Sequence, residues 1–304
     1  MKIIVPIPVT DAMILAGTTV AEPAAGETAW TSGGTYAIGD LRIRSTTHKA
    51  YACVQAHSGR TALPEVDAAY WLEKSPTQRW APFDTYASTR MVQAGPISYV
   101  LKPGYFNAVA LYGLSGNTAT VTVHDTPGGS VIYTETKSLY ADPAGWYEYL
   151  FGRQRPVDKL LFTDIPIRPT ATVTITLAGT AVELGMIVVG DYRSLLDDAQ
   201  WGGTEQGARA EPVTYSYIKT EDDGTVTIKR RHAATSMRAS VIMPREFGDQ
   251  AVAAVQEVLD TPTAWIATDA AGFTSLNVFG LGSASLDYTS SVHARMDVTV
   301  KGLI

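Results

Sequence analysis

The sequence predicts an all-β protein of several domains, with one flanking helix near residues 246–259. Threonine and valine alternate in short runs, as in ATVTVHD at 119–125 and ATVTITLAG at 171–179. Alternation with a period of two is typical of half-buried strands. Turn signals such as Gly128-Gly129 separate the runs. Regular spacing of strands and turns favours sandwiches or barrels.

The exception is EFGDQAVAAVQEVL at 246–259, where apolar residues recur at helical spacing. Thr261-Pro262 follows and is expected to end the helix. A single helix in such a chain is expected to pack across one face of a sandwich or barrel. Its apolar positions are Phe247, Ala251, Val252, Val255, Val258 and Leu259.

Length and composition limit the class of protein. A chain of 304 residues predicts about two or three domains. With 45% hydrophobic and 18% charged residues, it can form packed cores and is not disordered. A net charge of -6 provides no basic surface for nucleic acid, so sequence-specific nucleic-acid binding is not expected.

The beginning of the chain, MKIIVPIPVTDAMILAG, predicts an extended arm with an edge strand. Pro6 and Pro8 interrupt its apolar run, which is too short to span a bilayer, so neither a signal peptide nor membrane insertion is expected. Cys53 is the only cysteine. An intramolecular disulfide and a thiol-ligated zinc site are therefore excluded, and synthesis in a cytosol is expected.

We divide the chain by composition and by its turn signals. The C-terminal domain is expected to contain, in chain order, a hairpin, a strand, a helix and several further strands. The predicted parts are an extended arm at 1–25, an aromatic β-module at 26–80, a β-sandwich at 81–195, a linker at 196–212 and a final β-domain at 213–304.

The motifs of common enzymes are missing from the sequence. None of the five histidines lies in an HExxH motif. GLSGN at 113–117 fails the nucleophile-elbow pattern at its last position, and there is no P-loop. We therefore expect no catalytic residues, no cofactor and no metal. A pair of carboxylates for glycoside hydrolysis cannot be identified from sequence, so that possibility stays open.

The aromatic block between Trp30 and Trp71 resembles the small chitin- and cellulose-binding modules of carbohydrate-binding families 5 and 12. The resemblance covers about a sixth of the chain and departs from the family at residues 43–49, which replace a short glycine-containing hairpin. The matching positions are Trp30, Tyr36, Gly39-Asp40, Tyr51 and Trp71.

This resemblance implies a site where exposed rings stack on the C–H faces of sugars. The expected sugar-binding residues are Tyr51, Tyr70 and Trp71, ahead of Trp30, together with Tyr36. The alternative is that the rings form the core of the module, because a domain of ~50 residues without disulfides needs large side chains to fold.

The arm, the module and the junction TQRWAPFD at 77–84 together resemble tail proteins of long-tailed bacteriophages. Segments 105–125 and 184–192 resemble galactose-binding-like jelly rolls, a fold name that does not establish sugar binding. The last part resembles the tube-forming domain of phage tail and distal tail proteins, with a long hairpin at 213–231 and closing strands at 264–302.

These resemblances imply a structural virion protein of a siphophage tail tip, made in the bacterial cytoplasm. It would form a homo-oligomeric ring between the tail tube and the tip or baseplate hub, and its modules would contact host cell-surface polysaccharide. A closed ring would also pair strand edges that a monomer leaves open. The alternative is a secreted polysaccharide-binding protein or the binding portion of a glycan hydrolase. The sequence leaves the ring size open.

Overall fold

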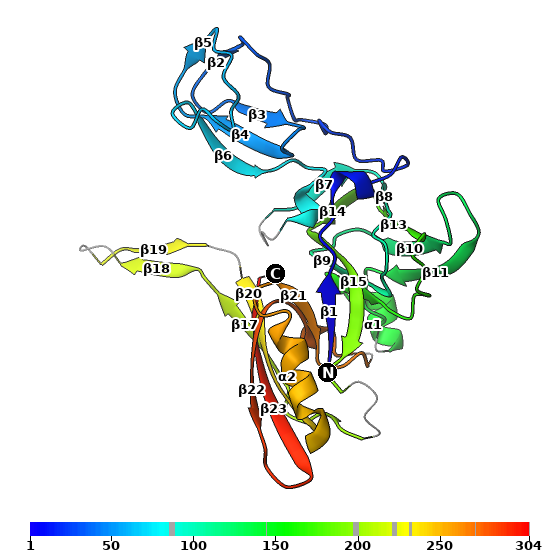
Figure 1. Ribbon diagram of the computed structural model, residues 1–304. Helices are drawn as coiled ribbons and strands as arrows, with labels where there is room; N and C mark the ends of the chain where they lie inside the picture. The colour runs from blue at the N-terminus through cyan, green and yellow to red at the C-terminus, as the bar shows by residue number, and fades with distance from the viewer. Residues whose placement is uncertain are drawn as a thin grey trace.

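The computed structural model describes residues 1–84, 89–143, 145–196, 201–220, 224–230, 233–270 and 272–303. Strands account for 47% and helices for 9% of the chain, which confirms the all-β, multidomain prediction. Figure 1 shows a small module at the top, a sandwich in the middle and a C-terminal domain below, from which one hairpin projects.

One sheet of ten antiparallel strands runs through both larger parts. The sandwich and the last domain are thus not separated by a break in the sheet. In spatial order its strands are β12 (Lys159–Phe162), β9 (Ala108–Tyr112), β15 (Met186–Ser194), β1 (Lys2–Pro6), β21 (Thr263–Ile266), β22 (Asn277–Asp287), β23 (His293–Gly302), β20 (Ala233–Pro244) and β16 (Gly203–Thr204), with β17 (Arg209–Thr214) also paired to β20.

The N-terminal strand is central rather than at an edge, which corrects the expectation of an extended arm. β1 pairs with β15 on one side and with β21 on the other. Ile3 and Ile4 point to opposite faces and are both fully buried, as is typical of a strand covered on both faces. Farther along, Ile14 and Val20 pack in the core of the sandwich.

A second sheet completes the sandwich. The burial of β10 alternates strictly, with Ala119, Val121 and Val123 facing the core, as its threonine-valine alternation predicts. The sheet has the order β11 (Val131–Ser138), β10 (Thr118–His124), β13 (Thr172–Ala178) and β8 (Ile97–Leu101), and β7 (Met91–Ala94) pairs separately with β14 (Ala181–Leu184).

The predicted helix is α2 (Gly248–Gln256), preceded by the 3-10 turn η3 (Arg245–Phe247). It packs on β22 and β23. Ala251, Val255 and Val258 enter the core around Trp265, whereas Leu259 is exposed. The helix is shorter than 246–259 at both ends, because its first turn is 3-10 and the regular helix ends at Gln256.

The predicted long hairpin is divided in two. β17 joins the large sheet, and only β18 (Tyr217–Thr220) and β19 (Val226–Lys229) form a separate two-stranded sheet, which projects from the C-terminal domain (Figure 1). Residues 221–223 and 231 of the expected hairpin lie outside the described residues.

The expected linker at 196–212 contributes β16 and the start of β17, while its residues 197–200 lie outside the described residues. A short helix, α1 (Trp146–Phe151), lies between β11 and β12 and was not predicted. The other 3-10 turns are η1 (Asp11–Met13), η2 (Ala81–Phe83) and η4 (Thr274–Leu276).

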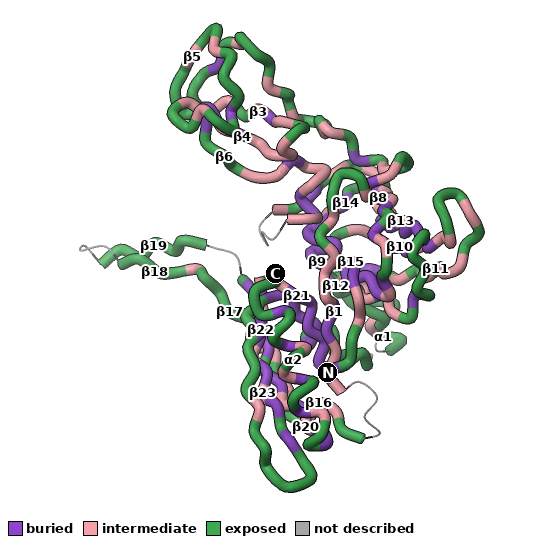
Figure 2. Tube along the Cα trace, viewed as in Figure 1, coloured by how far each residue is buried: buried purple, intermediate pink, exposed green. Residues whose placement is uncertain are grey.

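The module is built from two small sheets, and Figure 2 shows it standing apart from the buried interior of the larger parts. Glu22 ties its two ends together by accepting a hydrogen bond from Thr77 Oγ1 at 2.7 Å and contacting His48 Nδ1 at 3.0 Å. The His48 ring stacks on Trp80 with centroids 4.2 Å apart. The strands are β3 (Leu41–Arg44), β4 (Lys49–Cys53) and β6 (Trp71–Pro76) in one sheet, and β2 (Thr35–Tyr36) and β5 (His57–Ser58) in the other.

Candidate functional site

Three of the five expected sugar-binding residues lie in the core of the module. Tyr36, Tyr51 and Trp71 are buried together with Cys53. The Tyr36 and Trp71 rings meet edge to face, with centroids 5.0 Å apart. Because rings buried in this way present no face to solvent, the ranking of Tyr51 and Trp71 as the foremost sugar-facing residues is corrected: their position is that of core residues.

The hydroxyl groups of the two tyrosines are also used inside the module. Tyr36 donates to the Thr31 carbonyl at 2.8 Å and accepts from the Thr31 amide at 2.9 Å. The Tyr51 hydroxyl lies 3.2 Å from Thr47 Oγ1. Buried tyrosines usually satisfy their hydroxyl groups in this manner, so both residues have a structural role.

Tyr70 and Trp30 are half-buried, and arginines lie over their rings. The guanidinium carbon of Arg60 is 3.7 Å from the Tyr70 centroid, and Asp67 holds this arginine through a 2.9 Å ion pair. Arg44 lies 5.3 Å from the Trp30 centroid. A cation over a ring occupies the surface that a sugar would use. The module therefore offers less free aromatic surface than the spacing of its residues suggests.

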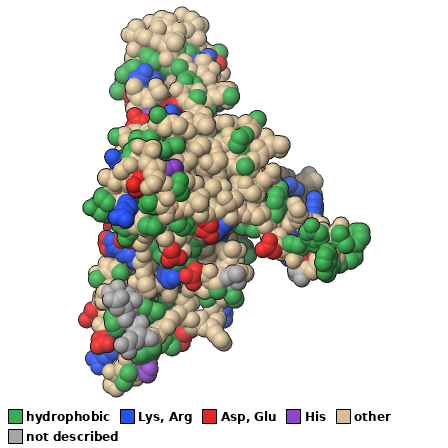
Figure 3. Space-filling view, turned by 90° about the vertical axis from the view of Figure 1, so that its right-hand side faces the viewer, with side chains coloured by type: hydrophobic (Ala, Val, Ile, Leu, Met, Phe, Trp, Pro, Cys, Tyr) green, Lys and Arg blue, Asp and Glu red, His purple; other side chains and the backbone are tan. Residues whose placement is uncertain are grey.

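Exposed aromatic side chains gather instead on α1 of the sandwich. Trp146, Tyr147, Tyr149 and Phe151 are 80%, 79%, 68% and 75% exposed, respectively. Figure 3, which looks at the side of the molecule that carries α1, shows hydrophobic side chains in a projecting cluster. The signal in the sequence is WYEYLF at 146–151, four aromatic residues in a segment too short to be a core helix.

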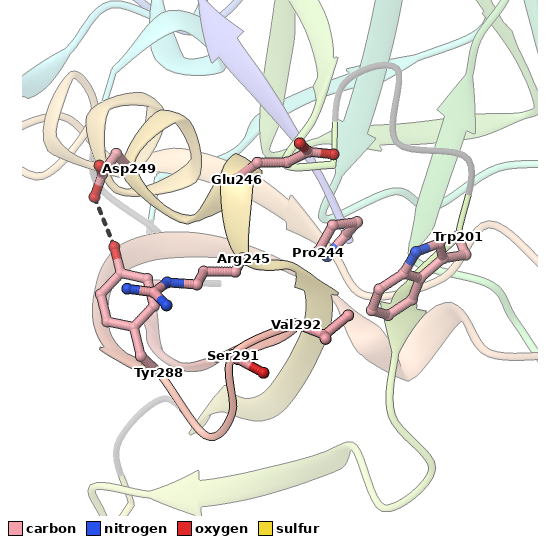
Figure 4. A pocket seen from close by; sticks show the side chains of 8 residues that line it. All are labelled: Trp201, Pro244, Arg245, Glu246, Asp249, Tyr288, Ser291 and Val292. Carbon is pink, nitrogen blue, oxygen red and sulfur yellow. Dashed lines mark hydrogen bonds between the residues drawn. The ribbon is translucent and has the colours of Figure 1, made fainter.

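A hollow with a volume of about 710 Å³ lies at the start of α2 (Figure 4). Tyr288 donates a 2.7 Å hydrogen bond to Asp249, which raises the pKa of this tyrosine. Arg245 lies 5.5 Å from the Tyr288 ring centroid. These polar groups are engaged with one another and shape the surface. The lining residues are Trp201, Pro244, Arg245, Glu246, Asp249, Tyr288, Ser291 and Val292.

Among the described residues, no group of three or more histidine, cysteine, aspartate or glutamate side chains is placed to hold a metal ion. Within the same ranges, no helix has the length and apolar character needed to cross a bilayer. Comparisons with protein-family models, with curated proteins and with solved structures give no significant match.

Two exposed features of the described surface carry clustered apolar side chains: the hairpin formed by β18 and β19, and the aromatic helix α1. Both carry large apolar side chains in contact with solvent. Such surfaces are suited to binding.

Proposed function

We propose that this chain is a structural protein of the tail tip of a long-tailed bacteriophage. It assembles into a homo-oligomeric ring that connects the tail tube to the distal tip or baseplate, and it contacts host polysaccharide at its outer surface. The observation that carries the ring proposal is the projecting hairpin of β18 and β19.

The hairpin has one apolar face. Ile218 lies opposite Ile228, and Val226 shares their face because it pairs with Thr220, two positions along the strand. Their exposed fractions are 66% for Ile218, 62% for Ile228 and 59% for Val226. A two-stranded hairpin alone is marginally stable in water. A second surface covering these side chains would remove them from solvent and stabilise the element.

A second copy of the chain is the occupant that we propose for this face. Each subunit extends its hairpin to the next, so the contact is heterologous, and such contacts close into rings when the rotation permits. The opposite face carries Tyr217, Lys219 and Lys229, which suits contact with solvent. The hairpin projects sideways from the domain that resembles tube-forming proteins, while the module lies at the top of the molecule in Figure 1.

The test measures the assembly of the full chain by mass photometry and negative-stain electron microscopy. We expect closed rings for the unaltered chain and folded monomers for Ile228→Asp. Ile38→Asp is the matched control, because Ile38 is 71% exposed on the module, and it should leave the rings intact. Labelled antibody against the chain should mark the distal end of the tail.

A strict monomer at high concentration that never co-assembles with tail-tube or hub proteins would overturn this proposal. Ring mass unaffected by Ile228→Asp would overturn the role of the hairpin.

The second candidate, a polysaccharide-binding protein or the binding portion of a glycan hydrolase, is favoured by the exposed aromatic residues of α1. Release of sugars from labelled host glycans would support the hydrolase version, and no release would remove it.

A further inference from the structure

The loop that carries α1 is held firmly at its base. Tyr140 and Pro156 form an antiparallel bridge. On either side of this bridge, the Ala141 amide donates to the Arg155 carbonyl at 2.9 Å and the Val157 amide donates to the Leu139 carbonyl at 2.8 Å. Leu139 belongs to the core of the sandwich. A loop closed at its base on a rigid scaffold is a frequent location for binding residues.

A cleft of about 230 Å³ lies beside the helix within this loop. Sites for drug-sized ligands usually have about 300–1,000 Å³, so this cleft suits a single small ring. Tyr149 forms an aromatic wall, and the Trp146 ring stands edge to face with it, with centroids 6.0 Å apart. The lining residues are Ala141, Asp142, Pro143, Glu148, Tyr149, Arg153, Gln154 and Arg155.

The polar lining supplies both hydrogen-bond donors and acceptors. Asp142, Arg153 and Gln154 have no side-chain hydrogen bond to any described residue. Arg155 pairs with Glu148 at 3.1 Å. Two carboxylates and two guanidinium groups balance in charge, which favours an uncharged ligand over an anionic one. Sugar hydroxyls both donate and accept, and the C–H face of a pyranose packs on an aromatic ring.

We propose that this cleft binds one pyranose unit of a neutral polysaccharide, with Tyr149 as the stacking platform and Asp142, Arg153 and Gln154 as the groups that bond its hydroxyls. The site lies on the sandwich and not on the aromatic module. Its role in host contact rests on the proposed tail-tip function, whereas binding itself does not require the ring.

The test is affinity electrophoresis of the full chain through gels containing galactomannan, xyloglucan or dextran. We expect at least one of these neutral polysaccharides to retard the chain. Tyr149→Ala and Trp146→Ala should each weaken that binding by about tenfold, while Tyr149→Phe keeps the ring and most of the affinity. Tyr105→Ala is the matched control, since Tyr105 and Tyr149 are both 68% exposed, and it should leave the affinity unchanged.

No retardation in any of the three gels overturns the proposal, as does unchanged affinity of Tyr149→Ala. Equal losses in Tyr149→Ala and Tyr105→Ala also overturn it. Loss of oligomer mass in Tyr149→Ala would overturn the proposal too, because α1 would then be a subunit contact. Binding of the chain to phosphatidylcholine vesicles in place of the glycans would also overturn it. The Ile228→Asp monomer should keep the affinity for each site, so failure of the ring proposal and failure of the saccharide proposal give different results.

Discussion

At the residue scale, the rings at the centre of the aromatic module determine whether it folds. Tyr36, Tyr51 and Trp71 surround Cys53 and form a core separate from the larger cores below. Few other apolar side chains are buried in this small unit. A small domain without disulfides buries little surface, so each large side chain supplies an unusually large part of its stability.

We predict that Trp71→Ala unfolds the module while the sandwich stays folded. Truncating a buried tryptophan costs about 3–5 kcal/mol, which exceeds what a unit of this size is expected to withstand. Hydrogen exchange should show loss of protection within residues 26–80 only. Leu72→Ala, at the neighbouring exposed position, should leave the protection intact. If Trp71→Ala kept full protection but lost glycan binding, Trp71 would be a binding residue.

Lys159 leads to a prediction about pH. It is buried, and its Nζ donates to the Asn277 carbonyl at 3.1 Å, joining β12 to β22. Burial lowers the pKa of this lysine below 10.5. Between the lowered pKa and 10.5 the unfolded chain binds more protons than the folded chain, so this lysine makes the free energy of unfolding rise with pH in that window.

Lys159→Met removes this titration. The free energy of unfolding of the unaltered chain relative to Lys159→Met should therefore increase as the pH is raised toward 10.5. The comparison cancels the ionisation of Tyr99 and Tyr112, whose pKa values burial raises in both proteins. Denaturant unfolding at a series of pH values gives the measurement. A difference that is flat with pH would show that Lys159 titrates in the folded chain as it does in solvent.

Sequence spacing placed aromatic residues on the strands of the module but did not show which surface they face. Arg60 lies over Tyr70 and Arg44 over Trp30, and such contacts depend on how the loops fold back. The aromatic residues of α1 are evident in the sequence, yet their exposure depends on a loop whose base is closed by the Tyr140–Pro156 bridge. The spacing of residues in the sequence predicts neither the arginine–ring contacts nor the exposure of the aromatic residues of α1.

At the element scale, the position of a strand with one buried face, such as β10, was predictable, whereas the position of β1, which is buried on both faces, was not. β10 alternates in the sequence and in burial, and α2 follows the helical period. β1 carries apolar residues on both faces, a pattern that does not distinguish an exposed arm from a central strand. The position of β1 depends on its pairing with β15 and β21, which lie nearly 200 residues or more away in the sequence.

Gly190 fixes how closely β1 and β15 approach, and this gives a third prediction. A Cβ added at Gly190 would lie 1.9 Å from the Val5 carbonyl oxygen, whereas one added at Gly145 would meet nothing within 4 Å. We expect Gly190→Ala to lower the free energy of unfolding by roughly 1–3 kcal/mol or more through overpacking, and Gly145→Ala to change it little. Equal unfolding temperatures for the two variants would show that β1 can shift at no cost.

At the scale of the whole molecule, the large sheet makes one body of the sandwich and the C-terminal domain, while the module is an insertion. The order of the predicted parts follows the chain, but the continuity of the sheet could not be derived because β1 and β15 are joined only by long-range pairing. The two ends of the module lie together: the Gln78 amide donates to Glu27 at 2.7 Å, and Thr77 donates to Glu22.

Because its ends are adjacent and its core is separate, the module should be removable. We predict that replacing residues 28–76 by a short glycine-serine linker leaves the body folded, since long changes in a surface connection alter loop entropy only slightly. The unfolding temperature of the body should change by only a few degrees, and rings should still form through β18 and β19.

The shortened chain should also keep its retardation by neutral polysaccharide, because α1 belongs to the sandwich. Loss of that retardation with the body intact would return sugar binding to the module, and failure of the body to fold would show that the stacking of His48 on Trp80 stabilises the sandwich as well.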